Sequence, residues 1–366
     1  MRKLLEIKHY RCLLLALICF CLGCFLSLSL VSMEKPCVLE TEDHEFNIMQ
    51  NSKLKNPELI ILVLSAYKNL ERRNAARHSW MQVGRKAVTG NSYNFKPYFV
   101  IGSLGLTNDD ILHLSSEQSR FADILILPIH DRYEKLAEKV LRMFQWLSEQ
   151  LKYGLDFKYA LKCDDDTFVN VPALLSAVQQ MEKTLETSSF QTPPEKFNSF
   201  ITTNVQCNDQ SSGLHLANMS WYWGYFNGNA HVKAGGKWKE SEWIACDKYV
   251  PYALGGGYIL SKPLVSYIAN NAANLRLFKA EDVSVGLWLA PITNIIRIHD
   301  VRMDSEWTTR GCKDHYLLTH KITPSDMRLM AGNFRATSKL CTKQSEVRRH
   351  YFYDWSIPPS RCCKPV

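Results

Sequence analysis

The sequence predicts an α/β fold with a mainly parallel central sheet, preceded by an N-terminal transmembrane helix. Two observations support this. Strand-length apolar runs and helical patterns alternate four times between Leu59 and Asp164, which is typical of parallel sheets with helices on both faces. Residues 12–33 contain no charged side chain. At about 1.5 Å per residue, this run is long enough to cross a hydrocarbon core of about 30 Å.

The N-terminal segment divides into a cytoplasmic tail at 1–11, a signal anchor at 12–33 and a polar stem at 34–56. A basic flank stays on the cytoplasmic side, and here it consists of Arg2, Lys3, Lys8 and Arg11. We therefore expect a single-pass type II orientation, with 57–366 as one large luminal domain. A cleaved signal peptide is the alternative, because Ser27-Leu28-Ser29 offers a small-residue cleavage site.

The first two strands of the domain are each followed by a helix signal. An apolar run from Leu59 to Ala66 predicts the first strand, and Asn69 is placed to cap a basic helix that continues to Trp80. A second strand is expected at 97–102. Thr107 and Asp110 then form a capping-box pattern, which opens a helix to about residue 120.

The next two strands lead to the most informative motif of the chain. A third strand is expected at 124–127, followed by an amphipathic helix over 133–151 that Gly154 is placed to end. The fourth strand, 157–163, runs directly into Asp164, Asp165 and Asp166. Mg²⁺ and Mn²⁺ prefer oxygen ligands and share them with substrate phosphates. This position predicts a metal-diphosphate site, with a solvated acidic turn as the alternative.

The second half of the chain is less regular. A short helix is expected after Pro172, and then a surface insertion at 184–219 that contains the glycosylation sequon at Asn218. Residues 221–258 are rich in aromatic side chains. Sugars expose apolar C–H faces that stack on aromatic rings, so this region is a candidate acceptor site; ordinary core packing is the alternative.

Composition narrows the class of protein. The chain has 44 Lys and Arg against 36 Asp and Glu, and this basic excess is spread along the sequence, which does not indicate nucleic-acid binding. Four of the 12 cysteines lie in the apolar N-terminal run. The others predict disulfides rather than a zinc site, because they form no Cys-x-x-Cys pairs, and their spacing leaves the pairing open. They are Cys37, Cys163, Cys207, Cys246, Cys312, Cys341, Cys362 and Cys363.

Further groups suit glycosyl transfer from a nucleotide sugar. Glu281-Asp282 precedes an apolar run and offers a carboxylate base, although an acidic pair that opens a helix also serves as a dipole partner. His320 and His299 are candidate nitrogen ligands, with a structural role as the alternative. The arginines after the first strand are candidate phosphate contacts, or else a solvated helix face; they are Arg72, Arg73 and Arg77.

Together, these motifs resemble those of the β-1,3-glycosyltransferase family (glycosyltransferase family 31). Four segments carry the resemblance in the same order: the Arg-Arg segment 71–80, Lys162 to Asp166, the glycine-rich segment 255–261 and Glu281 to Val283. Residues 284–291, 319–321 and 353–359 resemble members that act in the glycosaminoglycan linkage region. The segment 135–139 departs from the family's pattern, so no role is transferred to its altered positions.

The resemblance implies a GT-A type nucleotide-sugar transferase fold and an inverting, Mn²⁺-dependent galactosyltransferase anchored in the Golgi membrane. Its donor would be UDP-galactose and its acceptor a galactosyl-xylosyl primer on a proteoglycan. By position, Asp282 would be the base, Asp166 and His320 would ligate Mn²⁺, and four residues would contact the nucleotide sugar: Arg73, Arg77, Asp164 and Asp165. The alternatives are a relative with another donor, such as UDP-N-acetylglucosamine, or another acceptor, and a non-catalytic luminal chaperone or lectin.

Overall fold

The computed structural model describes residues 56–88, 94–187, 196–198, 200–206 and 220–365. The chain divides into two compact units, Met1–Leu54 and Lys55–Val366, and the described residues belong to the second. The expected tail and signal anchor, almost all of the stem and the Asn218 sequon lie outside the described residues. None of the helices in the described part has the length and apolar character needed to cross a bilayer.

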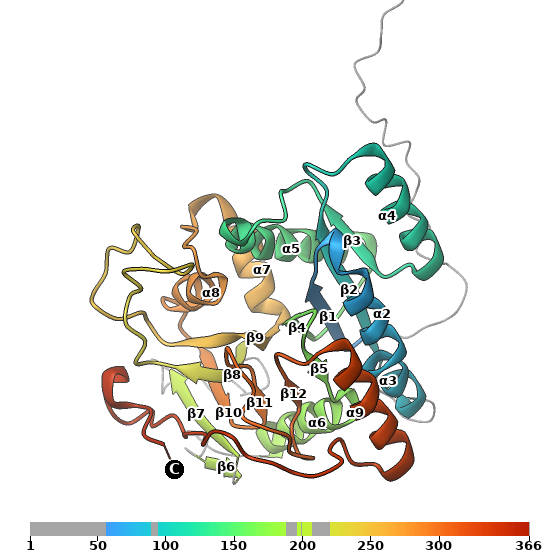
Figure 1. Ribbon diagram of the computed structural model, residues 1–366. Helices are drawn as coiled ribbons and strands as arrows, with labels where there is room; N and C mark the ends of the chain where they lie inside the picture. The colour runs from blue at the N-terminus through green and yellow to red at the C-terminus, as the bar shows by residue number, and fades with distance from the viewer. Residues whose placement is uncertain (1–55, 89–93, 188–195, 199, 207–219, 366) are drawn as a thin grey trace, which may run out of the picture. The chain divides into compact units, whose positions relative to one another are not determined.

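A nine-stranded sheet forms the centre of the described unit (Figure 1), in the order β3-β2-β1-β4-β9-β8-β10-β7-β6. Its strands are β1 (Leu59–Leu64), β2 (Phe95–Gly102), β3 (Ile124–Leu127), β4 (Tyr159–Asp164), β6 (Lys196–Asn198), β7 (Ile201–Gln206), β8 (Ser220–Asn227), β9 (Tyr252–Ser261) and β10 (Ile295–Asp300). The four strands expected from the sequence are β1 to β4.

The sheet is mixed, so the expectation of a mainly parallel sheet holds only for its first half. Strands β3, β2, β1 and β4 are parallel neighbours, because helical crossovers join them. Strand β9 lies antiparallel to both β4 and β8, and β7 lies antiparallel to β10. Only β8 and β10 restore a parallel pair in the second half. Antiparallel neighbours need no helical crossover.

Helices cover both faces of the sheet. They are α2 (Leu70–His78), α3 (Trp80–Val88), α4 (Asn108–Phe121), α5 (Leu136–Gln150), α6 (Val171–Thr187), α7 (Lys262–Asn270), α8 (Glu281–Leu289) and α9 (Pro324–Thr337). The described residues also contain short 3-10 turns: η1 (Tyr67–Asn69), η2 (Tyr133–Lys135), η3 (Leu151–Tyr153), η5 (Ala272–Asn274) and η6 (Pro359–Arg361). The Thr107–Asp110 capping box is present, and Gly154 ends η3 with φ +89°.

Side chains of the central strands alternate between two buried clusters. Leu59 and Ile61 of β1 belong to a cluster that includes residues of α2, α3, α6 and α9. Ile60 and Leu62 belong to the other, which includes residues of α5, α7 and α8. This alternation explains why β1 reads as one continuous apolar run: both of its faces are buried.

Two boundaries differ from the sequence-based expectation. The first helix ends at His78, and Ser79 (φ −111°, ψ −104°) separates it from α3. The segment 184–219 is not wholly a surface insertion, because α6 continues to Thr187 and β7 joins the sheet beside β10. Thr202 and Thr203 are buried in β7, and the Thr202 hydroxyl donates to the Tyr353 carbonyl. β-Branched threonines suit a strand, although their polarity suggests a loop.

Candidate active site

The carboxyl end of β4 separates the three aspartates into two environments. Asp165 is buried and accepts hydrogen bonds from Ser65 Oγ (2.8 Å), Asn69 Nδ2 (2.8 Å) and Arg72 Nη1 (2.9 Å). Asn69 therefore bonds to Asp165 instead of capping α2 as expected. The observed partners of Asp165 make it an anchor between β4 and the first helix. The nucleotide-sugar contact that the resemblance implied for Asp165 stays a prediction.

Asp164, Asp166 and His320 form the second environment. Their ligand atoms lie within 4.8 Å of one another, and His320 Nε2 is 3.1 Å from Asp166 Oδ1 and 3.4 Å from Asp164 Oδ2. Asp166 Oδ1 and His320 Nε2 are buried and make no hydrogen bond with any described residue. A buried carboxylate oxygen and a buried imidazole nitrogen that converge in this way are the arrangement expected around a shared cation, either a proton or a metal ion.

The backbone brings His320 to the triplet from a distant part of the sequence. A small sheet has the order β11-β12-β5, with β5 (Phe168–Val169), β11 (Met303–Asp304) and β12 (Leu318–Thr319). The Ile322 N–H donates to the Asp166 carbonyl (2.9 Å). His320 Nδ1 lies 2.8 Å from the Glu306 carbonyl, which leaves Nε2 turned toward the carboxylates. At Gly256, an added Cβ would lie 2.6 Å from His320 Nδ1, so the close approach of β9 requires a glycine.

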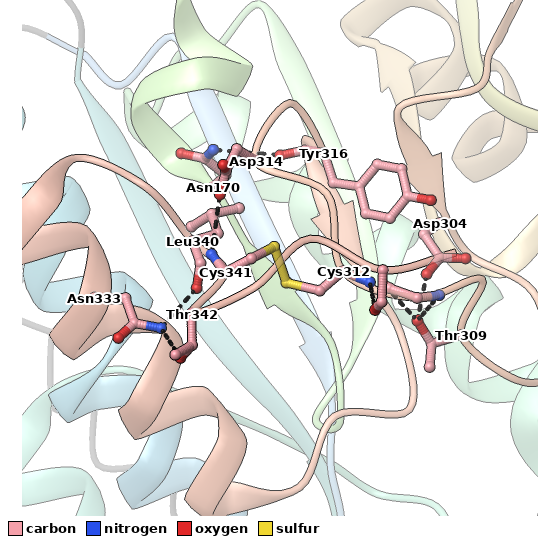
Figure 2. Close-up of a disulfide and its surroundings, with 12 residues drawn as sticks. Asn170, Asp304, Thr309, Cys312, Asp314, Tyr316, Asn333, Leu340, Cys341 and Thr342 are labelled. Carbon is pink, nitrogen blue, oxygen red and sulfur yellow. Dashed lines mark hydrogen bonds between the residues drawn. A yellow bond between two sulfur atoms is a disulfide. The ribbon is translucent and has the colours of Figure 1, made fainter. Parts of the chain in front are cut away.

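A disulfide holds the loop that leads to β12. Cys312 and Cys341 are bonded, and Figure 2 shows how this joins the loop before β12 to the segment after α9. The Cys341 N–H donates to Asp314 (3.0 Å), and Asn333 Nδ2 donates to the Leu340 carbonyl (3.1 Å). Cys362 and Cys363 are also bonded to each other. In the described part of the chain, Cys163 (buried) and Cys246 (exposed) are free thiols, whereas Cys37 and Cys207 lie outside it.

The cluster fits a divalent cation that prefers oxygen ligands and accepts an imidazole, as Mn²⁺ does. Burial disfavours a charged His320, but its contacts with Asp164 and Asp166 outweigh burial and raise its pKa to about 9. Burial also opposes ionisation of Asp164, yet Lys162 and His320 hold the pKa of that carboxyl below its usual value. The excess negative charge that attracts a proton also attracts a metal ion.

Asp282 lies in the first turn of α8. Its Oδ2 accepts from the Gly255 N–H and its Oδ1 from the Val283 N–H, both at 2.9 Å. Burial raises the pKa of Asp282, while Lys162 and these backbone donors lower it. An added Cβ at Gly255 would lie 3.2 Å from Asp282 Oδ2, so the glycine-rich strand leaves room for this carboxylate. The Asp282 carboxylate is half-buried and fixed in orientation.

Lys162 joins the two carboxylate groups into one site. It is 1% exposed, and its Nζ donates to Asp164 Oδ1 (2.9 Å), to the Gly255 carbonyl and to Glu281 Oε1. Burial raises the pKa of Glu281 to about 7, although Lys162 opposes this. The sequence alone indicates no role for Lys162, which is a lysine between apolar residues of β4.

Arg73 and Arg77, which the resemblance implied as nucleotide contacts, are bound by carboxylates of the fold. Both are buried in α2. Arg73 donates to Glu117 through two nitrogens (2.8 and 2.6 Å) and to the Ala66 carbonyl. Arg77 donates to both oxygens of Asp123 (2.9 and 2.7 Å). They join α2 to α4 and to the segment before β3, whereas the half-exposed Arg72 is the arginine that reaches the triplet.

We expect Arg77→Met to destabilise the fold by about 3–5 kcal/mol, because it leaves the buried Asp123 carboxylate without its partner. Urea denaturation measures this change. The exposed Arg85 of α3 provides the control, and Arg85→Met should stay within about 0.5 kcal/mol. If Arg77→Met were nearly as stable as wild type but had a raised KM for the nucleotide sugar, Arg77 would be a nucleotide-binding residue.

His299, the other candidate nitrogen ligand, is a structural histidine of β10. It is fully buried; its Nδ1 accepts from the Phe226 N–H (3.0 Å), and its Nε2 lies 2.9 Å from the Tyr351 carbonyl. Burial lowers its pKa to about 3. Both ring nitrogens are therefore used inside the sheet, away from the metal cluster.

This depressed pKa makes His299 a source of acid sensitivity. Below pH 6.5 the unfolded chain binds a proton at this residue that the folded chain does not bind until about pH 3, so stability falls as the pH is lowered through that window. The contribution is about 1.4 kcal/mol per pH unit. We expect His299→Gln to be less stable at pH 7 but to have a flatter pH dependence of the unfolding free energy. His231→Gln, at an exposed histidine, should keep the wild-type slope; an unchanged slope in His299→Gln would contradict the assignment.

Comparison with known proteins shows the family of the chain. The Galactosyltransferase family model matches residues 71–301. The chain is 38% identical over 307 residues to β-1,3-galactosyltransferase 6 of Mus musculus, covering 84% of this chain and 82% of the mouse protein. The chain belongs to the galactosyltransferase family. As a galactosyltransferase-family member it is a glycosyltransferase, and the matched range contains the aspartate triplet and Asp282 but ends before His320.

Two further likenesses are more distant. The chain is 30% identical over 274 residues to hydroxyproline O-galactosyltransferase GALT5 of Arabidopsis thaliana, covering 74% of this chain but only 34% of the plant protein. The crystal structure of a glycosyltransferase involved in the glycosylation of the major capsid of PBCV-1 covers 74% of this chain and 97% of its own. Its TM-score is 0.33 at 14% identity, too low to support an argument about the fold.

Proposed function

We propose that the protein is an inverting β-1,3-galactosyltransferase with a GT-A type fold, which transfers galactose from UDP-galactose to a galactosyl-xylosyl primer on a proteoglycan. One observation carries the proposal. The buried Lys162 contacts both Asp164 of the metal cluster and Glu281, the neighbour of Asp282. This one side chain therefore connects the site proposed for the leaving diphosphate with the proposed base. The identity to the mouse galactosyltransferase supports the choice of sugar.

Asp282 is the base in this proposal. It takes the proton of the acceptor hydroxyl while that oxygen forms a bond to C1 of galactose and the bond from C1 to the diphosphate oxygen breaks. Attack on the face opposite the leaving group inverts the configuration at C1, and this needs a single carboxylate base. Its two backbone hydrogen bonds orient the carboxylate for this transfer.

Asp164, Asp166 and His320 would hold Mn²⁺. When bound, this ion supplies positive charge that stabilises the departing UDP. Arg72 and Lys321 border the cluster, at 3.5 and 3.0 Å from Asp166 Oδ2, and add positive charge where phosphate groups arrive. Asp165 keeps the strand end in place through its bonds to Ser65, Asn69 and Arg72.

The proposed acceptor and the proposed cellular compartment are inferred mainly from the sequence. Residues 284–291 and 353–359 resemble galactosyltransferases of the glycosaminoglycan linkage region, and the apolar run at 12–33 with its basic flank suits a type II anchor in the Golgi membrane. Disulfides in the described part suit an oxidising lumen. Asn218 would then be open to glycosylation.

A transfer assay tests the proposal. It uses full-length protein in detergent micelles with Mn²⁺ and a galactosyl-β-1,4-xyloside primer. We expect product with UDP-galactose, and NMR of the product should show a β-1,3 linkage. UDP-N-acetylglucosamine tests the alternative donor in the same assay. If only UDP-N-acetylglucosamine gave product, UDP-galactose would not be the donor. If UDP-galactose were hydrolysed without transfer to the primer, the proposed acceptor would be wrong.

A further inference from the structure

A cavity of about 450 Å³ lies beside the segment that leads into α8. Three stretches line it: 134–138, which spans the end of η2 and the first turn of α5; 239–242 in the connection between β8 and β9; and 277–279 just before α8. Lys279 is three residues before Asp282. The volume lies within the range of small-ligand sites, which is about 300–1,000 Å³.

The connection between β8 and β9 packs beside one wall of this cavity at Tyr133. Tyr133 directly precedes Glu134 of the lining. Lys237 Nζ lies 5.6 Å from the Tyr133 ring centre and 4.3 Å from that of Trp238. Burial raises the pKa of Tyr133, and the charge of Asp282 adds to this rise.

The lining is polar, of mixed charge and partly fixed. Glu240 accepts from the backbone N–H groups of Lys279 (2.7 Å) and Glu242 (2.8 Å), so its carboxylate holds the two walls together. Carboxylates and ammonium groups are interspersed around the cavity, including Glu134, Lys239 and Lys279. This mixture suits a neutral ligand with many hydroxyl groups, which can donate to carboxylates and accept from ammonium groups. It does not suit a diphosphate, which favours clustered cations.

Trp238 supplies the apolar surface that a sugar ring needs. Most other aromatic residues of the region expected to line an acceptor site are buried, because they pack in the sheet; they include Trp221, Trp223, Tyr225 and Phe226. Trp238 is 38% exposed. Trp238 directly precedes Lys239 of the cavity lining, and an exposed indole next to a polar cavity is suited to carbohydrate stacking.

We propose that this cavity is the acceptor subsite, which binds the sugar that precedes the acceptor galactose, with Trp238 as its stacking surface and Lys279 as a hydrogen-bonding wall residue. The proposal rests on the proposed function, because it assumes an acceptor of at least two neutral sugars. It assigns the β8–β9 connection to acceptor specificity, whereas the metal cluster serves the donor.

Trp238→Ala and Lys279→Ala in the full-length protein test the subsite. We expect each to raise the KM for the galactosyl-xyloside primer about 3- to 10-fold, with the KM for UDP-galactose and the rate of donor hydrolysis within about two-fold of wild type. Matched controls lie on η3, where Tyr153 is 74% exposed and Lys152 is adjacent. Tyr153→Ala and Lys152→Ala should leave every parameter unchanged.

Saturation-transfer NMR with the same primer reports binding without turnover. Loss of primer signal in the two variants supports the subsite even if wild-type protein makes no product, in which case only the proposed function fails. Normal transfer by wild type, with unchanged acceptor KM and primer signal in both variants, overturns the subsite and leaves the function in place. A rise of the UDP-galactose KM equal to that of the primer would also overturn it, because the cavity would then serve the donor.

Discussion

Asp282→Asn should lower the turnover number for galactose transfer by about 10²- to 10⁴-fold, the usual contribution of a positioned general base. The amide has nearly the shape of the carboxylate but cannot take the acceptor proton. UDP should bind with near-normal affinity, because the groups assigned to the diphosphate lie at the end of β4 and after β12. Initial rates with saturating UDP-galactose, together with calorimetric titration of UDP, measure the two effects.

Two controls make this result specific. Asp282→Asn places an NH₂ group opposite one of the two backbone donors, from Gly255 or Val283, so we expect a loss of about 1 kcal/mol in stability, and the melting temperature must show that the variant remains folded. Asp109→Asn, in the first turn of α4, makes the same chemical change at another helix start and should retain full turnover. Turnover of Asp282→Asn within ten-fold of wild type would remove Asp282 as the base.

The pH profile gives a further check. Burial raises the pKa of Asp282 above the usual value for an aspartate, and the ionised form is the active one. Transfer should therefore fall on the acid side at a higher pH than an ordinary aspartate would give, and this acid limb should be missing from the residual activity of Asp282→Asn. The limb is read from kcat/KM for the acceptor at saturating UDP-galactose.

Local sequence signals were sufficient for the half of the sheet that carries the aspartates. Strands β1 to β4 are largely apolar runs separated by helical patterns, and this alternation predicts that they are parallel. Asp164 and Asp166 could be placed at a strand end because strand and motif are contiguous. The Thr107–Asp110 cap was likewise visible, since both partners lie within one turn.

Partners distant in sequence could not be predicted in the same way. Arg73 and Arg77 have the spacing of a helix face, but nothing local shows that Glu117 and Asp123 occupy their donors. The role of Lys162 depends on Glu281, which is 119 residues away. The polar composition of 184–219 predicts a surface insertion, whereas β7 within it is buried because it pairs with β10. The sequence alone offers both His320 and His299 as candidate ligands, and only the resemblance distinguishes His320 from the structural His299.

The second large expected effect is the loss of Mn²⁺ binding in variants of the metal cluster. His320→Ala should weaken Mn²⁺ binding by more than about 100-fold, since loss even of a residue that only supports a metal ligand costs about 10- to 100-fold. Asp166→Asn should act in the same direction. Electron paramagnetic resonance of free Mn²⁺ during titration measures affinity without any need for turnover, and transfer at fixed Mn²⁺ should fall in parallel.

Asp165→Asn provides the sharpest control, because it changes the middle residue of the same motif. Asp165 bonds to Ser65, Asn69 and Arg72 and lies outside the cluster formed by Asp164, Asp166 and His320. The variant should lose about 1–3 kcal/mol of stability, since it leaves buried donors poorly matched, while its Mn²⁺ affinity stays within a few-fold of wild type. If Asp165→Asn lost Mn²⁺ as completely as His320→Ala did while remaining folded, the ligand set would have to include Asp165. The division of the triplet into an anchor and two ligands would then be wrong.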